Sequence, residues 1–409
     1  MRRLVACAAL AAAVVLAAAP AGCGKKQESG TVITFWQFFE PGAIRPVLEK
    51  FEKEHPGVRV DMQQLTWADG RQKIIASVAA GGPPDLCELG STWVAKFAAD
   101  GAILDWTEDA RALRDRFRMW DTAEYDSRVY GLPWVVGTRA LFVNRDLFAR
   151  AGIDSFPETW CELLDASEKV DDLGDGVYGF GLNSGERYVL YKKFMPFAWG
   201  NGGAVLSADM QHSVFDSQEN LEALHFMTAL RPSSLLEKQD VLDRAFIEGR
   251  VGMVLSGAWL LRTLAKEAPS LRYAVVLVPK PDAGGSHASF AGGEVLVSFR
   301  NSKHPKEAFE LARFLVEPEN AIAVARVVRS VQPAAVGAED DPYYAEHPED
   351  RVFVEQLRTS VSTPAHPRWS EIEDVVNEAL EQAIHGTRKP EDALREGSRR
   401  IEALLATSS

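Results

Sequence analysis

The sequence predicts an α/β protein with more than one domain. Its 409 residues are 46% hydrophobic and 25% charged, and the chain is longer than the roughly 250–300 residues at which single hydrophobic cores stop growing. From Thr31 onward, short β-rich segments alternate with amphipathic helical segments, and no repeat of fixed period is present. Such alternation is typical of a largely parallel sheet with helices on both faces.

The first region follows this pattern closely. Its expected elements are a strand at 31–36 (TVITFW), a helix at 44–55 with Pro46 in its first turn, an alternating strand at 57–65, a helix at 67–82 closed by glycines, and a short strand at 83–90.

A second region begins at the turn formed by Gly131 and Pro133. Its expected elements are a helix at 156–170 with Thr159 as N-cap, small strands within 201–210, helices at 220–230 and 241–249, a buried strand near 251–256, a strand at 271–281, a strand and helix at 293–301 and 305–328, and helices over the last 50 residues that break at Gly386.

The N-terminus has the features of an export signal. Arg2 and Arg3 precede an apolar run that ends in APAGC at Cys23. An uncleaved membrane anchor is the alternative, because 19 apolar residues are just enough to span a bilayer. The PAGC junction resembles the lipobox of bacterial lipoproteins, although Pro20 stands where leucine is usual. This resemblance implies a signal peptide at 1–22, lipidation of Cys23, and a polar tether at 23–30.

Charge and motifs exclude several functions. The formal charge is −13, and loss of the signal leaves about −15, which disfavours nucleic acid as a partner. The chain has no G-x-S-x-G, H-E-x-x-H, Walker A or paired C-x-x-C motif, and its eight histidines are scattered. We therefore expect no catalytic residues, no metal and no cofactor. Cys87 and Cys161 are expected to be buried small residues.

The tryptophans indicate a ligand cleft. Several of the ten fall at strand ends or in loops: Trp36, Trp93, Trp134, Trp199 and Trp259. Ligands of α/β sheets bind beyond the carboxyl ends of strands, and flat aromatic faces next to hydrogen-bonding groups suit sugar rings. Glu40, Asp85 and Asn201 are candidate polar partners because they lie near these tryptophans in the sequence, although a core role is an alternative for each tryptophan.

Four segments in order resemble one protein family. They are GGPPDLCELGSTWVAKFAADGAILDW (81–106), YGLPWVVGTRALFVNRDLFARAGI (130–153), FIEGRVGMVLSGAW (246–259) and GGEVLVSFRNSKHPKEAFELARFL (292–315). Together they resemble the extracellular solute-binding proteins of bacterial ABC importers, of the sugar-binding, maltose-binding type. Val143 departs from the usual tyrosine of that family.

The resemblance implies an α/β, two-lobed, periplasmic-binding-protein-like fold of class II, with a ligand cleft between lobes that a multi-strand hinge joins. It implies lobe 1 at 31–138 and 282–330 and lobe 2 at 139–281 and 331–409, with crossings near 137–140, 279–282 and 330–332. It also implies ligand contacts from Trp36, Gln37, Glu40, Asp85, Gly257, Trp259, Gly292, Gly293, Glu294, Arg368 and Trp369, to which the tryptophan argument adds Trp93, Trp199 and Asn201.

In this interpretation Gly257 lets a ligand approach the backbone, and Trp259 stacks on a sugar ring. The resemblance further implies an exported, lipid-anchored monomer that delivers its ligand to permease subunits powered by a separate ATPase. A receptor for a polyamine, iron or an oxyanion on the same fold is an alternative, and a secreted glycan-active enzyme with two carboxylates is another.

Overall fold

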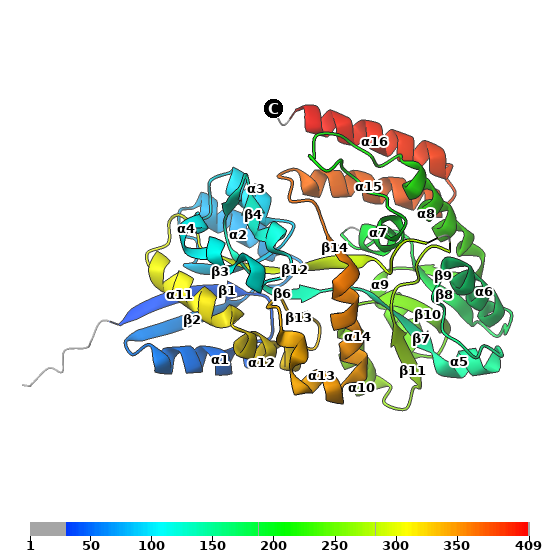
Figure 1. Ribbon diagram of the computed structural model, residues 1–409, viewed down its shortest axis with the longest axis horizontal. Coiled ribbons are helices and arrows are strands. Elements are labelled where there is room, and N and C mark those ends of the chain that lie inside the picture. Colours follow the sequence, from blue (N-terminus) through cyan, green and yellow to red (C-terminus); the bar gives the residue numbers. More distant parts are fainter. Residues whose placement is uncertain (1–29, 187, 283, 408–409) are drawn as a thin grey trace, which may run out of the picture.

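The computed structural model describes residues 30–186, 188–282 and 284–407. The predicted signal peptide, Cys23 and all of the tether except Gly30 lie outside these residues. The described chain forms two lobes that lie side by side, with α15 and α16 packed together on the second lobe (Figure 1). Among the described residues, no helix combines the length and hydrophobicity needed to cross a membrane.

The sheet of lobe 1 is mixed. In spatial order it contains β13 (Gln332–Pro333), β6 (Leu132–Gly137), β12 (Ser289–Val297), β3 (Leu86–Gly90), β1 (Thr31–Gln37) and β2 (Val58–Gln64), and β14 (Ser360–Ser362) pairs with the start of β12. The strands β1, β2 and β3 are mutually parallel, whereas β12 runs antiparallel to β3 and β6. The three parallel strands therefore end at one edge of the sheet.

Helices cover both faces of this sheet. They are α1 (Pro41–Glu54), α2 (Gly70–Ala79), α3 (Val94–Ala99), α4 (Thr107–Ala110), α11 (Pro305–Val316) and α12 (Pro318–Val328). The helices α1, α11 and α12 share one core with Phe35 and Trp134, while α2 and α3 pack with Leu89 and Val297 on the other side. The helix predicted over 305–328 is broken at Glu317, because Pro318 starts a new helix there.

Lobe 2 repeats this construction around a five-stranded sheet. Its order is β11 (Tyr273–Val276), β7 (Ala140–Asn144), β10 (Val251–Ser256), β8 (Tyr178–Asn183) and β9 (Ser234–Glu237). Its helices are α5 (Arg145–Arg150), α6 (Trp160–Asp171), α7 (Tyr191–Gly200), α8 (Gln218–Ala229), α9 (Gln239–Ile247), α10 (Trp259–Glu267), α14 (Pro348–Gln356), α15 (Trp369–Ile384) and α16 (Pro390–Ala406).

Local signals place several of these helices. Thr159 caps α6 in a capping box with Glu162, as its position before the helical pattern predicts. The break between α15 and α16 falls at Gly386, whose φ of 71° is a left-handed conformation that glycine adopts without strain. Residues 201–210 form no extended strand, and Leu206 makes a single bridge to Ser213.

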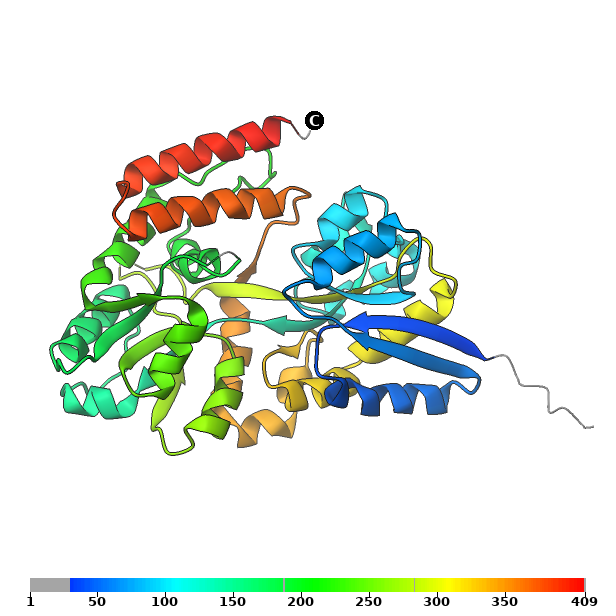
Figure 2. The same ribbon diagram turned by 180° about the vertical axis from the view of Figure 1, so that it is seen from behind.

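The chain passes between the lobes at three places, visible from both sides (Figures 1 and 2). The first crossing joins β6 to β7, where Thr138 Oγ1 donates to the carbonyl oxygen of Phe290 at 2.7 Å. The second is β12 itself, because Phe290 packs in the core of lobe 2 while Leu296 packs in that of lobe 1.

The third crossing differs from the prediction of 330–332. The strand β13 pairs with β6, and Ala334 and Ala335 pack in the core of lobe 1. The chain joins lobe 2 only through α13 (Pro342–Glu346) and α14, whose Phe353 is buried against lobe 2. A two-residue strand carries no periodicity, so the sequence pattern does not reveal it. Residues 284–288 likewise stay with lobe 2, where Ser286 N donates to the carbonyl oxygen of Gly200.

Candidate functional site

A cavity of about 420 Å³ lies between the two lobes. Segments that follow β2 and β3 form its lobe 1 wall, the starts of α7, α10 and α15 form its lobe 2 wall, and β12 with the β6–β7 crossing forms its floor. The cavity therefore sits beyond the carboxyl ends of parallel strands, the usual ligand position of an α/β sheet. Its volume is in the range of ~300–1,000 Å³ typical of small-molecule sites.

Aromatic rings dominate the lobe 1 wall. Trp67 stacks on Phe38 with ring centroids 4.2 Å apart, and Trp93 lies 5.6 Å from Trp67 in a tilted arrangement. Trp67 keeps 50% of its surface exposed. Arg71, on α2, stands 5.8 Å above the ring of Trp93. This cluster presents aromatic faces to the cavity beside one guanidinium group.

Trp259 forms the centre of the lobe 2 wall, at the start of α10. Its Nε1 donates to Asp243 Oδ2 at 2.9 Å, and the same carboxylate accepts from Ser256 Oγ at 2.9 Å. A Cβ atom at Gly257 would lie 1.9 Å from Cζ3 of Trp259. The glycine is therefore required by the tryptophan ring itself, which lies against the Gly257 backbone, and not by a ligand that approaches the backbone.

The floor repeats this pairing of a glycine with a ring. A Cβ atom at Gly292 would lie 2.2 Å from Cζ of Phe290, so the glycine makes room for that ring. At Gly293 a Cβ atom would lie 2.1 Å from the carbonyl oxygen of Val135. Only glycine therefore allows β12 to pack this closely against β6. Arg139 lies 4.7 Å from the Trp259 ring and 5.2 Å from the Phe290 ring.

Three ionisable groups on the cavity surface, from different parts of the chain, have shifted pKa values. Burial lowers the pKa of Arg139 to about 10 and that of Lys192 to about 8. Burial raises the pKa of Glu294 to about 8, and the nearby Lys192 and Arg139 work against that rise. Among the described residues, no group of three or more His, Cys, Asp or Glu side chains is placed to hold a metal ion.

Five of the fourteen predicted ligand-binding residues line this cavity: Trp93, Trp259, Gly292, Gly293 and Glu294. Gly257 lies beneath the Trp259 ring, as described above. The other eight lie outside the cavity, each for an identifiable reason.

Three of these eight belong to the turn after β1. Trp36 is half-buried under Lys73, whose Nζ stands 5.0 Å from the ring. Gln37 is fully buried, and its Oε1 accepts from Phe39 N at 2.5 Å. Glu40 is exposed and precedes α1. From this turn it is Phe39 that reaches the cavity.

Asp85 lies at the opposite edge of the sheet, because β3 begins only at Leu86. Its Oδ2 accepts from Thr34 N and Thr34 Oγ1, and its Oδ1 accepts from Ser302 Oγ and from the backbone N–H groups of Lys303 and His304. Burial pushes the pKa of Asp85 upward, but these hydrogen bonds outweigh it and hold the pKa below its ordinary value. The residue ties two segments of lobe 1 together.

The C-terminal candidates also serve structure. Trp369 is 1% exposed and packs edge-on against Tyr191 in the core of lobe 2. Arg368 pairs with Glu371 and donates to the carbonyl oxygen of Leu404. Asn201 donates to Glu222 and to the carbonyl oxygen of Glu219, beside α8.

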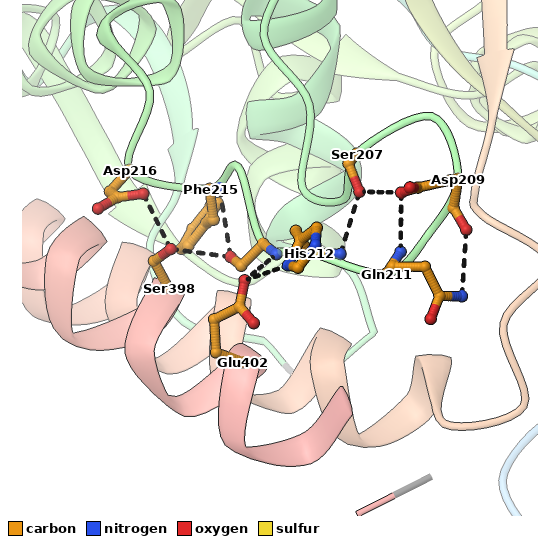
Figure 3. A network of polar contacts seen from close by, with 9 residues as sticks. Ser207, Asp209, Gln211, His212, Phe215, Asp216, Ser398 and Glu402 are labelled. Carbon is orange, nitrogen blue, oxygen red and sulfur yellow. Dashed lines mark hydrogen bonds and ion pairs between the residues drawn. The ribbon is translucent and has the colours of Figure 1, made fainter. Parts of the chain in front are cut away.

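Trp199 and Arg368 line a second, more open groove of about 1150 Å³ between the lobes. One side of this groove is the loop 203–216, which hydrogen bonds hold against α16. Ser398 Oγ donates to Asp216 at 2.9 Å, and Glu402 accepts from Ser213 N at 2.6 Å (Figure 3). These hydrogen bonds make the loop an ordered part of lobe 2.

Several cavity residues escape the sequence prediction, above all Trp67, Arg71, Arg139 and Lys192. Trp67 follows the second strand directly, so the strand-end argument that selects Trp93 applies equally to it. The three cations carry no such signal, because many exposed Arg and Lys residues occupy similar helical and loop positions in the sequence. Cys161 is exposed, so the expectation that both cysteines are buried is wrong for it; Cys87 is buried, and both are free thiols.

Comparisons with known proteins agree with this architecture. Residues 40–322 match the family described as bacterial extracellular solute-binding protein. A putative binding protein of Brucella abortus is 28% identical over 88% of this chain and 89% of its own length. A galactooligosaccharide-binding protein of Bacillus subtilis is 26% identical over 94% of this chain and 93% of its own.

Solved structures show the same fold. An ABC transporter solute-binding protein from Thermotoga lettingae, bound with alpha-D-tagatose, aligns with a TM-score of 0.80 and 25% identity, and covers 92% of this chain and 100% of its own. A cyclic alpha-maltosyl-1,6-maltose binding protein from Arthrobacter globiformis aligns with a TM-score of 0.82 and 24% identity over 92% and 99% of the two chains.

Proposed function

Because the chain belongs to the family of bacterial extracellular solute-binding proteins, we propose that it captures a sugar or short oligosaccharide in the cavity between its lobes. The observation that carries this proposal is the composition of the walls, where Trp67, Trp93 and Trp259 stand next to charged hydrogen-bonding groups. Aromatic faces bind the apolar face of a sugar ring, and the polar groups bind its hydroxyl edge.

Lobe closure provides the mechanism. A ligand between the lobes contacts both walls only when they are close together, so binding favours the closed form by the difference in contacts between the two forms. Trp259 is held by Asp243 and backed by Gly257, which keeps the ring in place before a ligand arrives. Such preorganisation reduces the entropy lost on binding.

A screen of mono- and oligosaccharides by thermal shift, followed by calorimetry of the hits, tests the proposal. A ligand present at 100 times its Kd stabilises the folded state by about 2.7 kcal/mol, which is a measurable rise in Tm. We expect at least one saccharide to raise Tm and to be recovered chemically intact. Absence of a shift with every saccharide contradicts sugar capture, and recovery of hydrolysed product supports a glycan-active enzyme instead.

The polyamine alternative has less support in this cavity. It requires several carboxylates to converge. Of the predicted residues Glu40, Asp85 and Glu294, only Glu294 lines the described cavity; Glu373 adds a second carboxyl group there, but three cations line the same walls. We therefore propose no second function. Spermidine and putrescine belong in the same thermal-shift screen as negative controls.

We also propose that the protein is exported, anchored through a lipid on Cys23, and acts as a monomer that delivers its ligand to ABC permease subunits. The signal-like residues 1–22 and the PAGC junction support the anchor. Mass spectrometry of membrane-extracted protein should find a chain that begins at lipidated Cys23. If a Cys23→Ala variant is found in the membrane fraction to the same extent as the wild type, the proposed lipid anchor is wrong.

A further inference from the structure

Three cationic side chains line the cavity. Arg71 comes from α2 in lobe 1, Arg139 from the β6–β7 crossing, and Lys192 from α7 in lobe 2. None of them forms an ion pair with a carboxylate in the part of the chain that the structure describes, and the buried Nε atoms of Arg71 and Arg139 have no acceptor there. Among the described residues, the Arg139 guanidinium donates only to the carbonyl oxygen of its neighbour Thr138, at 3.2 Å.

Two partly buried arginines elsewhere in the described chain are paired with carboxylates, whereas the buried Lys193 donates to the carbonyl oxygen of Leu255. Arg329 is 28% exposed and contacts Asp350 at 2.6 Å, and Arg118 is 21% exposed and contacts Glu339. A buried charge without a partner costs free energy, which is the reason such pairs are the rule. Arg71, Arg139 and Lys192 are partly buried, lack such a carboxylate partner among the described residues, and all line the cavity where a ligand would bind.

Aromatic rings satisfy these cations only in part. Arg139 lies over Trp259 and Phe290, and Lys192 Nζ lies 5.2 Å from the Phe290 ring. A ring face attracts the charge of the cation, but it leaves the in-plane N–H donors of a guanidinium unfilled. Those donors have the fork geometry that matches a carboxylate or phosphate.

The two carboxyl groups on the cavity wall offset only part of this charge. Burial raises the pKa of Glu294 to about 8, so most of its population carries a proton at neutral pH. Glu373, the second carboxyl group on the wall, acts as a negative charge on Lys192, which leaves Arg71 and Arg139. The cavity therefore keeps an excess of positive charge although the protein as a whole has a formal charge of −13.

We propose that the ligand is a saccharide with an anionic substituent, which Arg71, Arg139 and Lys192 bind from three sides. This inference rests on the proposed function and narrows its substrate class. A uronic acid carboxylate and a sugar phosphate share the required chemistry. The cations come from both lobes and from the crossing, so one anionic group between them would also link the two walls on closure.

Calorimetry with matched pairs tests this inference. The panel is D-galactose with D-galacturonate, D-glucose with D-glucuronate and with glucose 6-phosphate, and α-1,4-galactobiose with α-1,4-digalacturonate. We expect an acidic member to bind about 10- to 100-fold more tightly than its neutral counterpart, the range for charge-assisted hydrogen bonds. A preference for glucuronate or galacturonate identifies a carboxylate as the source, and a preference for glucose 6-phosphate identifies a phosphate.

Neutral sugars that bind as tightly as acidic ones overturn the inference and leave sugar capture standing. Binding of no saccharide at all overturns both the inference and the proposed function.

Two variants test the role of the cations directly. Lys192→Gln removes a cavity cation, and Lys266→Gln removes an exposed lysine on α10 that lies away from the cavity. Lys192→Gln should weaken the acidic ligand about 10-fold or more while its neutral counterpart changes less than about 3-fold, and Lys266→Gln should change neither. Equal loss for both ligands in Lys192→Gln contradicts anion recognition.

Discussion

Gly257→Ala should displace Trp259 and weaken both lobe 2 and the ligand site. The added methyl group would lie 1.9 Å from Cζ3, 2.3 Å from Cε3 and 2.5 Å from Cη2 of the ring. No relaxation of a few tenths of an ångström removes three such overlaps, so the ring must leave its position. When it leaves, the 2.9 Å hydrogen bond from Nε1 to Asp243 is lost as well.

Two costs set the magnitude. Overpacking costs about 1–3 kcal/mol, and loss of a hydrogen bond to a charged group costs about 1.5–3 kcal/mol, part of which water at a half-buried ring recovers. We therefore expect a loss of about 3 kcal/mol. For a unit the size of lobe 2 this lowers the ligand-free Tm by about 6–12 °C. Affinity for the best saccharide should fall as well, because the ring no longer lines the cavity.

Thermal unfolding and calorimetry of four variants measure these effects. Gly42→Ala on α1 is the matched control, because a Cβ atom there meets nothing within 4 Å, and it should keep or slightly raise Tm. Trp259→Ala removes the obstacle, so the double variant Gly257→Ala/Trp259→Ala should be about as stable as Trp259→Ala. Additive losses in the double variant would refute the claim that Gly257 exists to accommodate this ring.

Three further predictions concern lobe 1. Glu88→Gln should raise Tm at pH 8 and leave it nearly unchanged at pH 4. Burial raises the folded pKa of Glu88 well above its ordinary value, so above the unfolded pKa the folded state loses up to about 1.4 kcal/mol of stability per pH unit. An equal rise in Tm at both pH values contradicts this reasoning. Asp85→Ala should destabilise lobe 1 by about 3 kcal/mol without changing ligand affinity more than twofold, roughly, and calorimetry that shows a larger loss returns Asp85 to the ligand site. Trp67→Ala should weaken saccharide binding by about tenfold while Tm falls by less than about 2 °C, because half of this ring is exposed; a fall in Tm without a loss of affinity would assign Trp67 to the core.

The sequence predicts lobe 1 most accurately where strands carry clear alternation. The strand β1 ends at Gln37, one residue beyond the predicted end, and β3 ends at Gly90 as predicted. The prediction for Asp85 is wrong for a different reason. Asp85 is selected because it lies near Trp93 in the sequence, but β3 (Leu86–Gly90) separates the two residues, so Asp85 lies at the amino end of the strand and away from the cavity. Residues that are close in sequence can therefore lie at opposite ends of one strand.

Side-chain direction explains most remaining errors. Trp369, Ile372, Val376 and Leu380 recur at helical spacing, which is the signature of a core stripe, and all four are buried. The pattern therefore assigns Trp369 to the core once the register of α15 is considered. Arg139 is the opposite case. The crossing at 137–140 was expected, but no sequence rule indicates that its arginine turns between Trp259 and Phe290.

The position of Arg139 indicates that it contributes to ligand affinity but not to the closing of the two lobes. Its backbone is tied to β12, since its N–H donates to Ser289 Oγ and Ser289 Oγ donates to its carbonyl oxygen at 2.7 Å. In the proposed closure mechanism, Arg139 belongs to the crossing about which the lobes move, so a ligand reaches it whether the lobes are apart or together. A contact that the ligand makes equally in the open and the closed form raises its affinity for both forms, and so does not change the ratio of closed to open protein. Closure must be driven by groups carried on the moving walls, Trp93 and Arg71 on one side and Trp259 and Lys192 on the other. We therefore propose that a constant contact at the crossing holds the ligand, while the contacts on the two walls couple its binding to lobe closure.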